Sequence, residues 1–209
     1  MITDNLELWN AVEKTDPAHT KNANVRGNKI TAIAPQYQIK CATEKFGPYG
    51  KSWGFSNIEL EYLQEKGLAV FKGDFFYPRS FKDVVEDHDV IAVARFQIIS
   101  SIGLYRDNAQ TKIDDDFAKK LETDALTKAL SKLGFNADVF MGKFDDSRYV
   151  AQMEEEFSDV KPADAIDSLE MASDLETLQK VWTDLPAPLK KRQDIIKTKD
   201  SQKEKLTNK

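Results

Sequence analysis

The sequence predicts an α+β fold, with an antiparallel three-stranded meander packed on one long helix and a small helical unit at the C-terminal end. Three segments rich in β-branched and aromatic residues follow one another over residues 53–63, 68–77 and 90–105, which is typical of neighbouring strands. The apolar residues of 113–133 recur with helical spacing. After Tyr149 the composition becomes acidic and then proline-containing, which indicates the start of a second unit.

Residues 1–46 are expected to form two helices joined by a polar loop. The apolar side chains that follow Leu6 indicate a short opening helix, and residues 15–28 are predicted as a loop that closes at Gly27. The next helix should span residues 35–46, and its buried side carries Ile39, Ala42 and Phe46. Its other side is expected to face outward and carries Tyr37, Cys41 and Lys45, with Lys40 nearby.

The long helix over residues 113–133 has a predicted start and a predicted end. Thr111 and Asp114 have the spacing of a capping box. Asp115 and Asp116 suit the positive end of a helix, and Gly134 suits its C-terminal stop. The predicted buried arc holds Ala118, Leu121, Ala125, Leu126, Ala129, Leu130 and Leu133. The opposite arc is either a ligand-facing surface or a solvated helix face, and it holds Lys120, Asp124, Thr127, Lys128 and Ser131, with Lys132 at its edge.

Three regions are predicted along the chain: a core domain over 1–152, an acidic linker over 153–164, and a small helical unit with a basic tail over 165–209. In the last region, Ser173 and Glu176 have the spacing of a capping box that opens a helix. The final residues from Lys190 onward include eight basic and three acidic side chains and few apolar ones. A frayed helix or a disordered basic tail is therefore expected there.

One basic and aromatic segment stands out in an acidic chain. The 209 residues carry a formal net charge of -5, yet residues 20–56 hold six Lys or Arg and one Glu. Aromatic residues lie among these cations, and an unpaired nucleic-acid strand needs both, since charge meets its phosphates and ring faces meet its bases. The segment therefore indicates nucleic-acid binding, or else a solvated helix face followed by a core strand.

Composition and motifs exclude several other classes of protein. The single cysteine, Cys41, excludes an internal disulfide and a thiolate metal cluster, in keeping with a reducing cytoplasm. Neither a secretion signal nor a membrane-spanning run is expected, so the sequence predicts a soluble cytoplasmic protein. No cofactor is expected either. The triplet Gly50, Lys51 and Ser52 lacks the earlier glycine of a phosphate-binding loop, and it precedes a predicted strand rather than a helix. Nucleotide hydrolysis is therefore not expected.

A metal-dependent nuclease is the enzyme alternative. Asp114, Asp115 and Asp116 would point about 100° apart on a helix, so they should not converge on one ion, and helix capping explains them better. A metal site that uses Asp74 or Glu59 is not excluded by spacing.

Two separated motifs resemble one family, the phage single-strand annealing proteins of the Sak type, which are similar to the eukaryotic recombination mediator Rad-fifty-two. The first motif is YQIKCATEKFGPYGKSW over residues 37–53, and the second is ETDALTKALSKLG over residues 122–134. The two motifs flank the three predicted strands, and the resemblance covers roughly residues 5–150.

The resemblance implies a β-β-β-α core, assembly into rings or helical filaments, and a basic groove that holds single-stranded DNA. It matches Lys128 to a groove-lining basic residue and places Tyr49 or Tyr37 near the DNA contacts. Thr127 and Ser131 stand where the family often has basic residues. Local charge offers other candidates for the DNA contacts, namely Lys40, Lys45, Lys51, Lys120 and Lys132.

The expected function is therefore ATP-independent binding and annealing of single-stranded DNA in homologous recombination and DNA repair, by a homo-oligomeric phage protein that is not an enzyme. The expected partners are single-stranded DNA, further copies of the chain, and an exonuclease or a single-strand-binding protein, with no membrane. The alternatives are the metal-dependent nuclease and a protein-binding adaptor that has no affinity for DNA.

Overall fold

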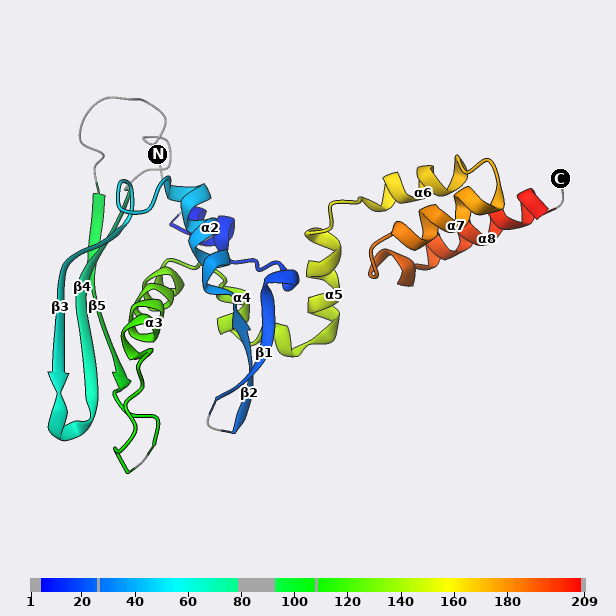
Figure 1. Cartoon of the computed structure of the whole chain (residues 1–209). Coiled ribbons are helices and arrows are strands. Elements are labelled where there is room, and N and C mark those ends of the chain that lie inside the picture. Colours follow the sequence, from blue (N-terminus) through cyan, green and yellow to red (C-terminus); the bar gives the residue numbers. More distant parts are fainter. Residues whose placement is uncertain (1–4, 26, 79–92, 108, 208–209) are drawn as a thin grey trace. The chain divides into compact units, whose positions relative to one another are not determined.

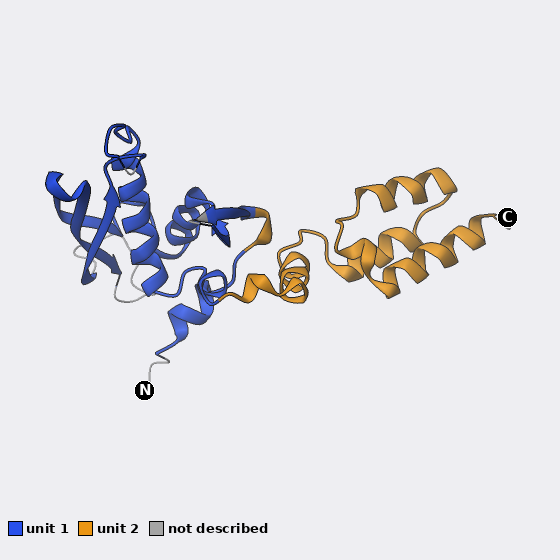
Figure 2. Ribbon diagram, turned by 90° about the horizontal axis from the view of Figure 1, so that it is seen from below, with its two compact units in different colours: residues 1–15, 19–141 blue, residues 16–18, 142–209 orange. Residues whose placement is uncertain are grey.

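The computed structural model describes residues 5–25, 27–78, 93–107 and 109–207 (Figure 1). Arg26 and the first residues of the strand predicted over 90–105 lie outside these ranges. The chain divides into two compact units (Figure 2), of which unit 1 comprises residues 1–15 and 19–141 and unit 2 comprises residues 16–18 and 142–209. The architecture is mixed α+β, as predicted. None of the helices within the described ranges has the length and apolar character needed to span a bilayer.

The N-terminal part of unit 1 contains a β-hairpin where the sequence predicted a polar loop. The short helix α1 (Glu7–Val12) is confirmed, and the single turn η1 (Pro17–His19) follows it. Strand β1 (Thr20–Val25) then pairs antiparallel with β2 (Asn28–Ile33). The loop prediction is wrong because β1 is mostly polar, with Ala23 and Val25 as its only apolar residues, so its period-2 hydrophobic signal is weak. Gly27, with φ of 86°, makes the turn.

The predicted three-stranded meander is confirmed. Helix α2 (Pro35–Phe46) leads through a turn into β3 (Gly54–Leu63), which is followed by the turn η2 (Gln64–Lys66). Strand β3 pairs antiparallel with β4 (Leu68–Pro78), and β4 pairs with β5 (Val93–Gly103), so that the sheet order is β3-β4-β5.

The long helix α3 (Phe117–Lys132) begins four residues after the predicted start. The capping box predicted for Thr111 and Asp114 is wrong, because the backbone N–H of Thr111 donates to Asp107 at 3.1 Å and Asp114 bonds to Lys120 at 2.6 Å. The turn that follows α3 leads into α4 (Ala137–Phe140), which completes unit 1.

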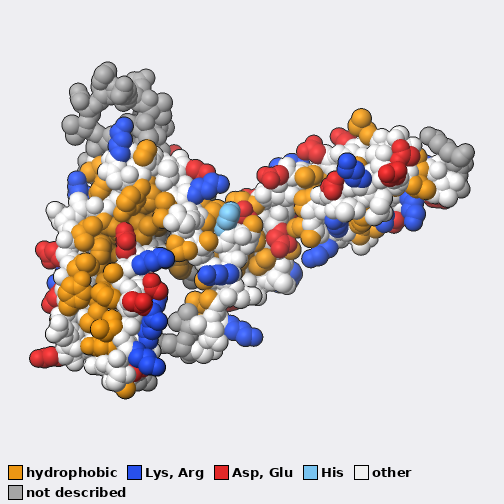
Figure 3. All heavy atoms as spheres, viewed as in Figure 1, with side chains coloured by type: hydrophobic (Ala, Val, Ile, Leu, Met, Phe, Trp, Pro, Cys, Tyr) orange, Lys and Arg blue, Asp and Glu red, His pale blue; other side chains and the backbone are white. Residues whose placement is uncertain are grey.

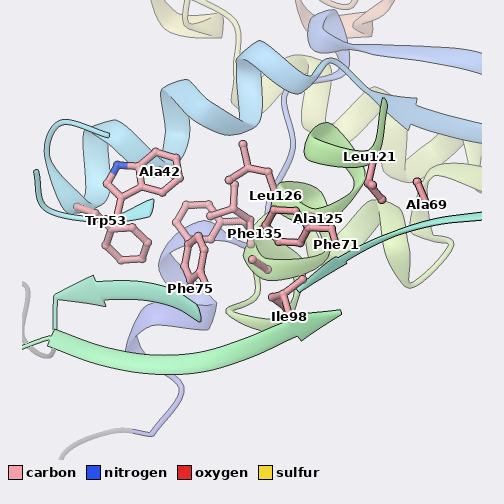
Figure 4. Close-up of a cluster of buried hydrophobic side chains, with 13 residues drawn as sticks. Ala42, Trp53, Ala69, Phe71, Phe75, Ile98, Leu121, Ala125, Leu126 and Phe135 are labelled. Carbon is pink, nitrogen blue, oxygen red and sulfur yellow. The ribbon is translucent and has the colours of Figure 1, made fainter. Parts of the chain in front are cut away.

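The core of unit 1 lies between α3 and the sheet. Most of the predicted apolar arc of α3 is buried there, although Ala118 is exposed. Figure 4 shows Phe75 and Ile98 of the sheet pointing toward Leu126 and Phe135. Residues of α2 join the same cluster.

Helix α2 turns the predicted side to the core, and part of its predicted outward side is covered as well. Ala42 and Phe46 are fully buried as expected, and the indole N–H of Trp53 donates to the carbonyl of Gly47 at 2.8 Å. Tyr37, however, is buried and stacks on His19 with ring centroids 4.3 Å apart. The prediction that Tyr37 faces outward is therefore wrong, since His19 at the end of η1 packs on its ring.

Unit 2 is entirely helical. It contains η3 (Lys143–Asp145), α5 (Ser147–Glu156), α6 (Pro162–Glu170), α7 (Leu175–Asp184), η4 (Leu189–Lys191) and α8 (Gln193–Thr207). The linker predicted over 153–164 is helical at both ends, because α5 and α6 extend into it. The side chain that caps α7 is Asp174, which accepts from the N–H of Thr177 at 2.7 Å, so the cap predicted at Ser173 is displaced by one residue.

Helix α8 replaces the predicted frayed or disordered tail. Ile195 is fully buried in the cluster that α6 and α7 also form, and the side-chain amide of Gln202 donates to the carbonyl of Ala172 at 2.8 Å. A few well-spaced apolar residues are enough here, because tertiary packing rather than composition stabilises the helix.

Candidate nucleic-acid interface

Unit 1 contains an open groove of about 770 Å³ between the β1–β2 hairpin and the outer face of α3. Its lining comes from five elements: β2, the start of α2, the end of β5, the first three turns of α3 with the residue before them, and the end of α4. Figure 3 shows the hollow between α3 and the hairpin, with Lys and Arg side chains along the α3 side. Segments about 100 residues apart in the sequence thus form one concave surface.

The α3 wall of the groove is polar and charged. It presents the ammonium groups of Lys119 and Lys120 and the hydroxyls of Thr123 and Thr127. Within the described ranges Lys119 has no ion-pair partner, whereas Lys120 donates to Asp114 at 2.6 Å. That hydrogen bond is the main reason why the pKa of Asp114 lies below its ordinary value.

Carboxylates offset part of the positive charge of this wall. Asp116 and Asp124 also line the groove, so two carboxylates stand beside two ammonium groups. The hydroxyl of Ser100 in β5 donates to Asp124, which holds that carboxylate against the sheet. The groove is therefore less cationic than the sequence alone indicated.

The base of the groove rests on a chain of buried hydrogen bonds, here called the Gln38–Asp138 network. The Thr127 hydroxyl donates to the amide oxygen of Gln38 at 2.8 Å, and the amide nitrogen of Gln38 donates to Asn136 at 3.4 Å. Asn136 donates to the Thr15 hydroxyl at 3.0 Å, and that hydroxyl donates to Asp138 at 2.6 Å. Since every buried group here has a partner, the network fixes the base of the groove.

The hairpin wall of the groove is apolar. Its side chains include Ile30 and Ile33 of β2, together with Pro35 of α2 and Phe140 of α4. Ile30 is 44% exposed and Phe140 is 52% exposed, so both can contact a ligand directly. The groove thus combines an apolar wall with a wall of ammonium and hydroxyl groups, an arrangement that suits a ligand with flat apolar parts and phosphates.

Among the predicted DNA-binding residues of α3, Lys120 lines the groove, and the other two lie along β5. The ammonium of Lys128 donates to the carbonyl of Ile99 at 2.9 Å. The ammonium of Lys132 lies 5.8 Å from the centre of the Phe96 ring. Both side chains therefore contact the edge strand of the sheet, and their role toward DNA stays a prediction.

The remaining four predicted residues lie on α2 and in the turn that follows it. Lys40 pairs with Glu44 at 3.7 Å on an exposed face, and Lys45 is half-buried. Tyr49 is 48% exposed and its ring packs edge-on against Trp53, while Lys51 is exposed. None of the four belongs to the lining of the groove.

Asp114, Asp115 and Asp116 lie closer together than the sequence predicted. They precede α3 rather than belong to it, and one carboxylate oxygen from each lies within 4.8 Å of the others. The prediction that they diverge on a helix is therefore wrong. Arg106 pairs with Asp114 and Asp115, and Lys120 pairs with Asp114, so these cations neutralise much of the cluster.

A comparison of the sequence with models of known protein families finds no match, and a search among curated proteins finds none either. The assignment of function therefore depends on the groove and on the two sequence motifs.

Proposed function

We propose that unit 1 binds single-stranded DNA in the groove between α3 and the hairpin, and that the protein anneals complementary strands without ATP in homologous recombination. The observation that carries this proposal is the pairing of an apolar wall at Ile30 and Phe140 with ammonium groups at Lys119 and Lys120. A single strand presents bases and phosphates at once, whereas a duplex hides its bases. The groove matches the single strand better.

The mechanism needs no bond chemistry. Lysines neutralise part of the phosphate charge of one strand, which lowers its repulsion toward a second strand. Repeated copies of the groove in an oligomer hold a long stretch of DNA, so a complementary strand can pair along it. The arrangement of β3, β4 and β5 with α3 supports an assignment as the β-β-β-α core of the Sak and Rad-fifty-two type.

An exposed apolar row on β3 supports assembly of several copies. Leu60 and Tyr62 lie opposite Phe71 and Ala69 in the register, so they point to the face of the sheet that α3 covers. Both are nevertheless about half exposed, at 51% and 50%. Strand β3 is also an edge of its sheet, and an apolar edge is a common site of contact with another chain.

The assembly proposal is tested by native mass spectrometry of a double variant, Leu60→Lys with Tyr62→Lys. We expect the wild-type chain to form oligomers and the variant to be shifted toward monomer. Glu59→Lys is the control, because Glu59 adds the same new charge at a neighbouring exposed position of β3. A monomeric wild-type chain, or equal assembly of the variant, would contradict the proposal.

The annealing function is tested with two labelled complementary oligonucleotides, the full chain and no ATP. We expect full-length duplex to form faster than without protein, both with and without Mg²⁺. Mg²⁺-dependent loss of the labelled strands would instead favour the nuclease. A chain that does not bind the oligonucleotides at low salt would favour the adaptor, and the helical unit 2 would then be the first place to look for a protein partner.

In the annealing model, unit 2 is the proposed contact for an exonuclease or a single-strand-binding protein.

A further inference from the structure

Phe140 is a large apolar side chain that stays exposed inside the groove. The residue is 52% exposed, and α4, which carries it, contacts β2, which carries the similarly exposed Ile30. A single exposed apolar residue is ordinary on a protein surface. Two of them within a groove whose other wall is polar form a surface that a flat apolar ligand can cover.

The backbone beneath Phe140 is firmly held. Asp138, two residues earlier, is fully buried and accepts from both the N–H and the hydroxyl of Thr15, at 2.8 and 2.6 Å. Further backbone hydrogen bonds join Asn136 to Val12 at 2.9 Å and Asp138 to Glu13 at 3.1 Å. Because the turn is already fixed, placing a ligand on the ring costs little conformational entropy.

The opposite wall decides which way a strand can lie. Lys119 and Lys120 carry ammonium donors on the α3 side, and donors of this kind contact phosphate oxygens. A strand with its phosphates on that wall has its bases toward the hairpin and α4. An aromatic face accepts any base, so such a contact is tolerant of sequence.

We propose that Phe140, together with Ile30, is a platform on which one base of the bound strand stacks. This inference rests on the proposed function, because it names a contact within the same groove. It adds a base contact from α4, which neither motif of the sequence contains.

The test compares two probes and three variants of the full chain. The probes are a labelled oligothymidylate and an abasic oligonucleotide of the same length, which keeps the phosphates and lacks the bases. Phe140→Ala should weaken binding of oligothymidylate roughly 5- to 150-fold, as expected for the loss of one stacked base. It should leave binding of the abasic probe within about twofold of the wild-type value. The variant Phe140→Trp should keep the wild-type affinity for oligothymidylate, because it retains an aromatic ring. Phe157→Ala is the matched control, since Phe157 is an exposed phenylalanine of unit 2.

Other outcomes overturn the inference in distinguishable ways. Unchanged binding of oligothymidylate by Phe140→Ala rejects the platform and leaves the proposed function standing, provided that the wild-type chain binds both probes. Equal loss for the two probes shows a structural role for Phe140 and also rejects the platform. Wild-type protein that binds neither probe rejects the platform together with the proposed function. A change of oligomeric mass in Phe140→Ala without a change in affinity assigns the ring to a contact between copies.

Discussion

The two walls of the groove differ in chemistry and in the way the fold holds them. The α3 wall carries ammonium and hydroxyl groups on a helix whose other side fills the hydrophobic core. The hairpin wall carries apolar side chains and is completed by Phe140 of α4, and the Gln38–Asp138 network holds α4 in place. In this fold a polar network positions an apolar surface, while a hydrophobic core positions a charged one. Each wall can therefore be disturbed separately.

The largest expected effect is on the free energy of unfolding, when Asp138 of the Gln38–Asp138 network is replaced. Asp138→Ala removes the acceptor of two hydrogen bonds from Thr15 and leaves those donors buried, so the free energy of unfolding of unit 1 should fall by about 3 kcal/mol. Urea unfolding followed by tryptophan fluorescence measures this, since Trp9 and Trp53 lie in unit 1. Asp145→Ala, at an exposed position, is the control. Equal stability of the two variants would show that the network does not anchor the wall.

The next effect separates the lysines of α3. Replacing Lys119 and Lys120 with Ala should weaken binding of a single-stranded oligonucleotide by about 2 kcal/mol, or roughly 30-fold, because two charged contacts to phosphate are lost. Replacing Lys128 and Lys132 with Ala is the matched control on the same helix, and fluorescence anisotropy measures both. If the second pair weakens binding more than the first, the DNA path follows β5, as the family resemblance predicts for Lys128.

A smaller effect concerns salt. Two ammonium groups facing the strand predict a slope of log affinity against log salt of roughly -1.4 per bound protomer, at about -0.7 for each phosphate. Affinity should then fall only about sevenfold between about 50 and 200 mM salt. A slope several times steeper would mean that lysines outside the groove contact phosphates as well, and Lys40, Lys45 and Lys51 would be the first candidates.

The smallest effect concerns the hydrogen bond where α3 meets the network. Thr127→Val leaves the amide oxygen of Gln38 without its donor and should lower the free energy of unfolding by about 1 kcal/mol. Thr123→Val is the control, because the Thr123 hydroxyl donates to a carbonyl of its own helix at 2.8 Å. The same urea titration measures both, and a larger loss for the Thr123 variant would contradict the role given to Thr127.

Local signals predicted most of the fold of unit 1. Pro35 and Gly47 mark the ends of α2, and the β-branched and aromatic composition marks the three strands of the sheet. The hairpin was not predictable in this way, because β1 is mostly polar and carries only a weak hydrophobic period. Helix α8 was missed for a related reason, since few apolar residues such as Ile195 attach it to unit 2.

The candidate site was less predictable than the fold. Lys120 could be placed on an outward arc of α3 from helical spacing alone. Phe140 and Ile30 could not be assigned to the same groove, because their proximity depends on a hairpin and a turn that meet only in the folded chain. Lys119 adjoins Lys120 in the sequence, and two consecutive lysines at the start of a helix are a signal that could have indicated it.

The most direct test of the groove as the DNA site is photocrosslinking of the full chain to an oligonucleotide that contains a photoreactive thymine analogue, followed by mass spectrometry of the peptides. We expect crosslinks on peptides from the start of α3, from α4 and from β2. Crosslinks found only on peptides of unit 2, with none on those three elements, would contradict it.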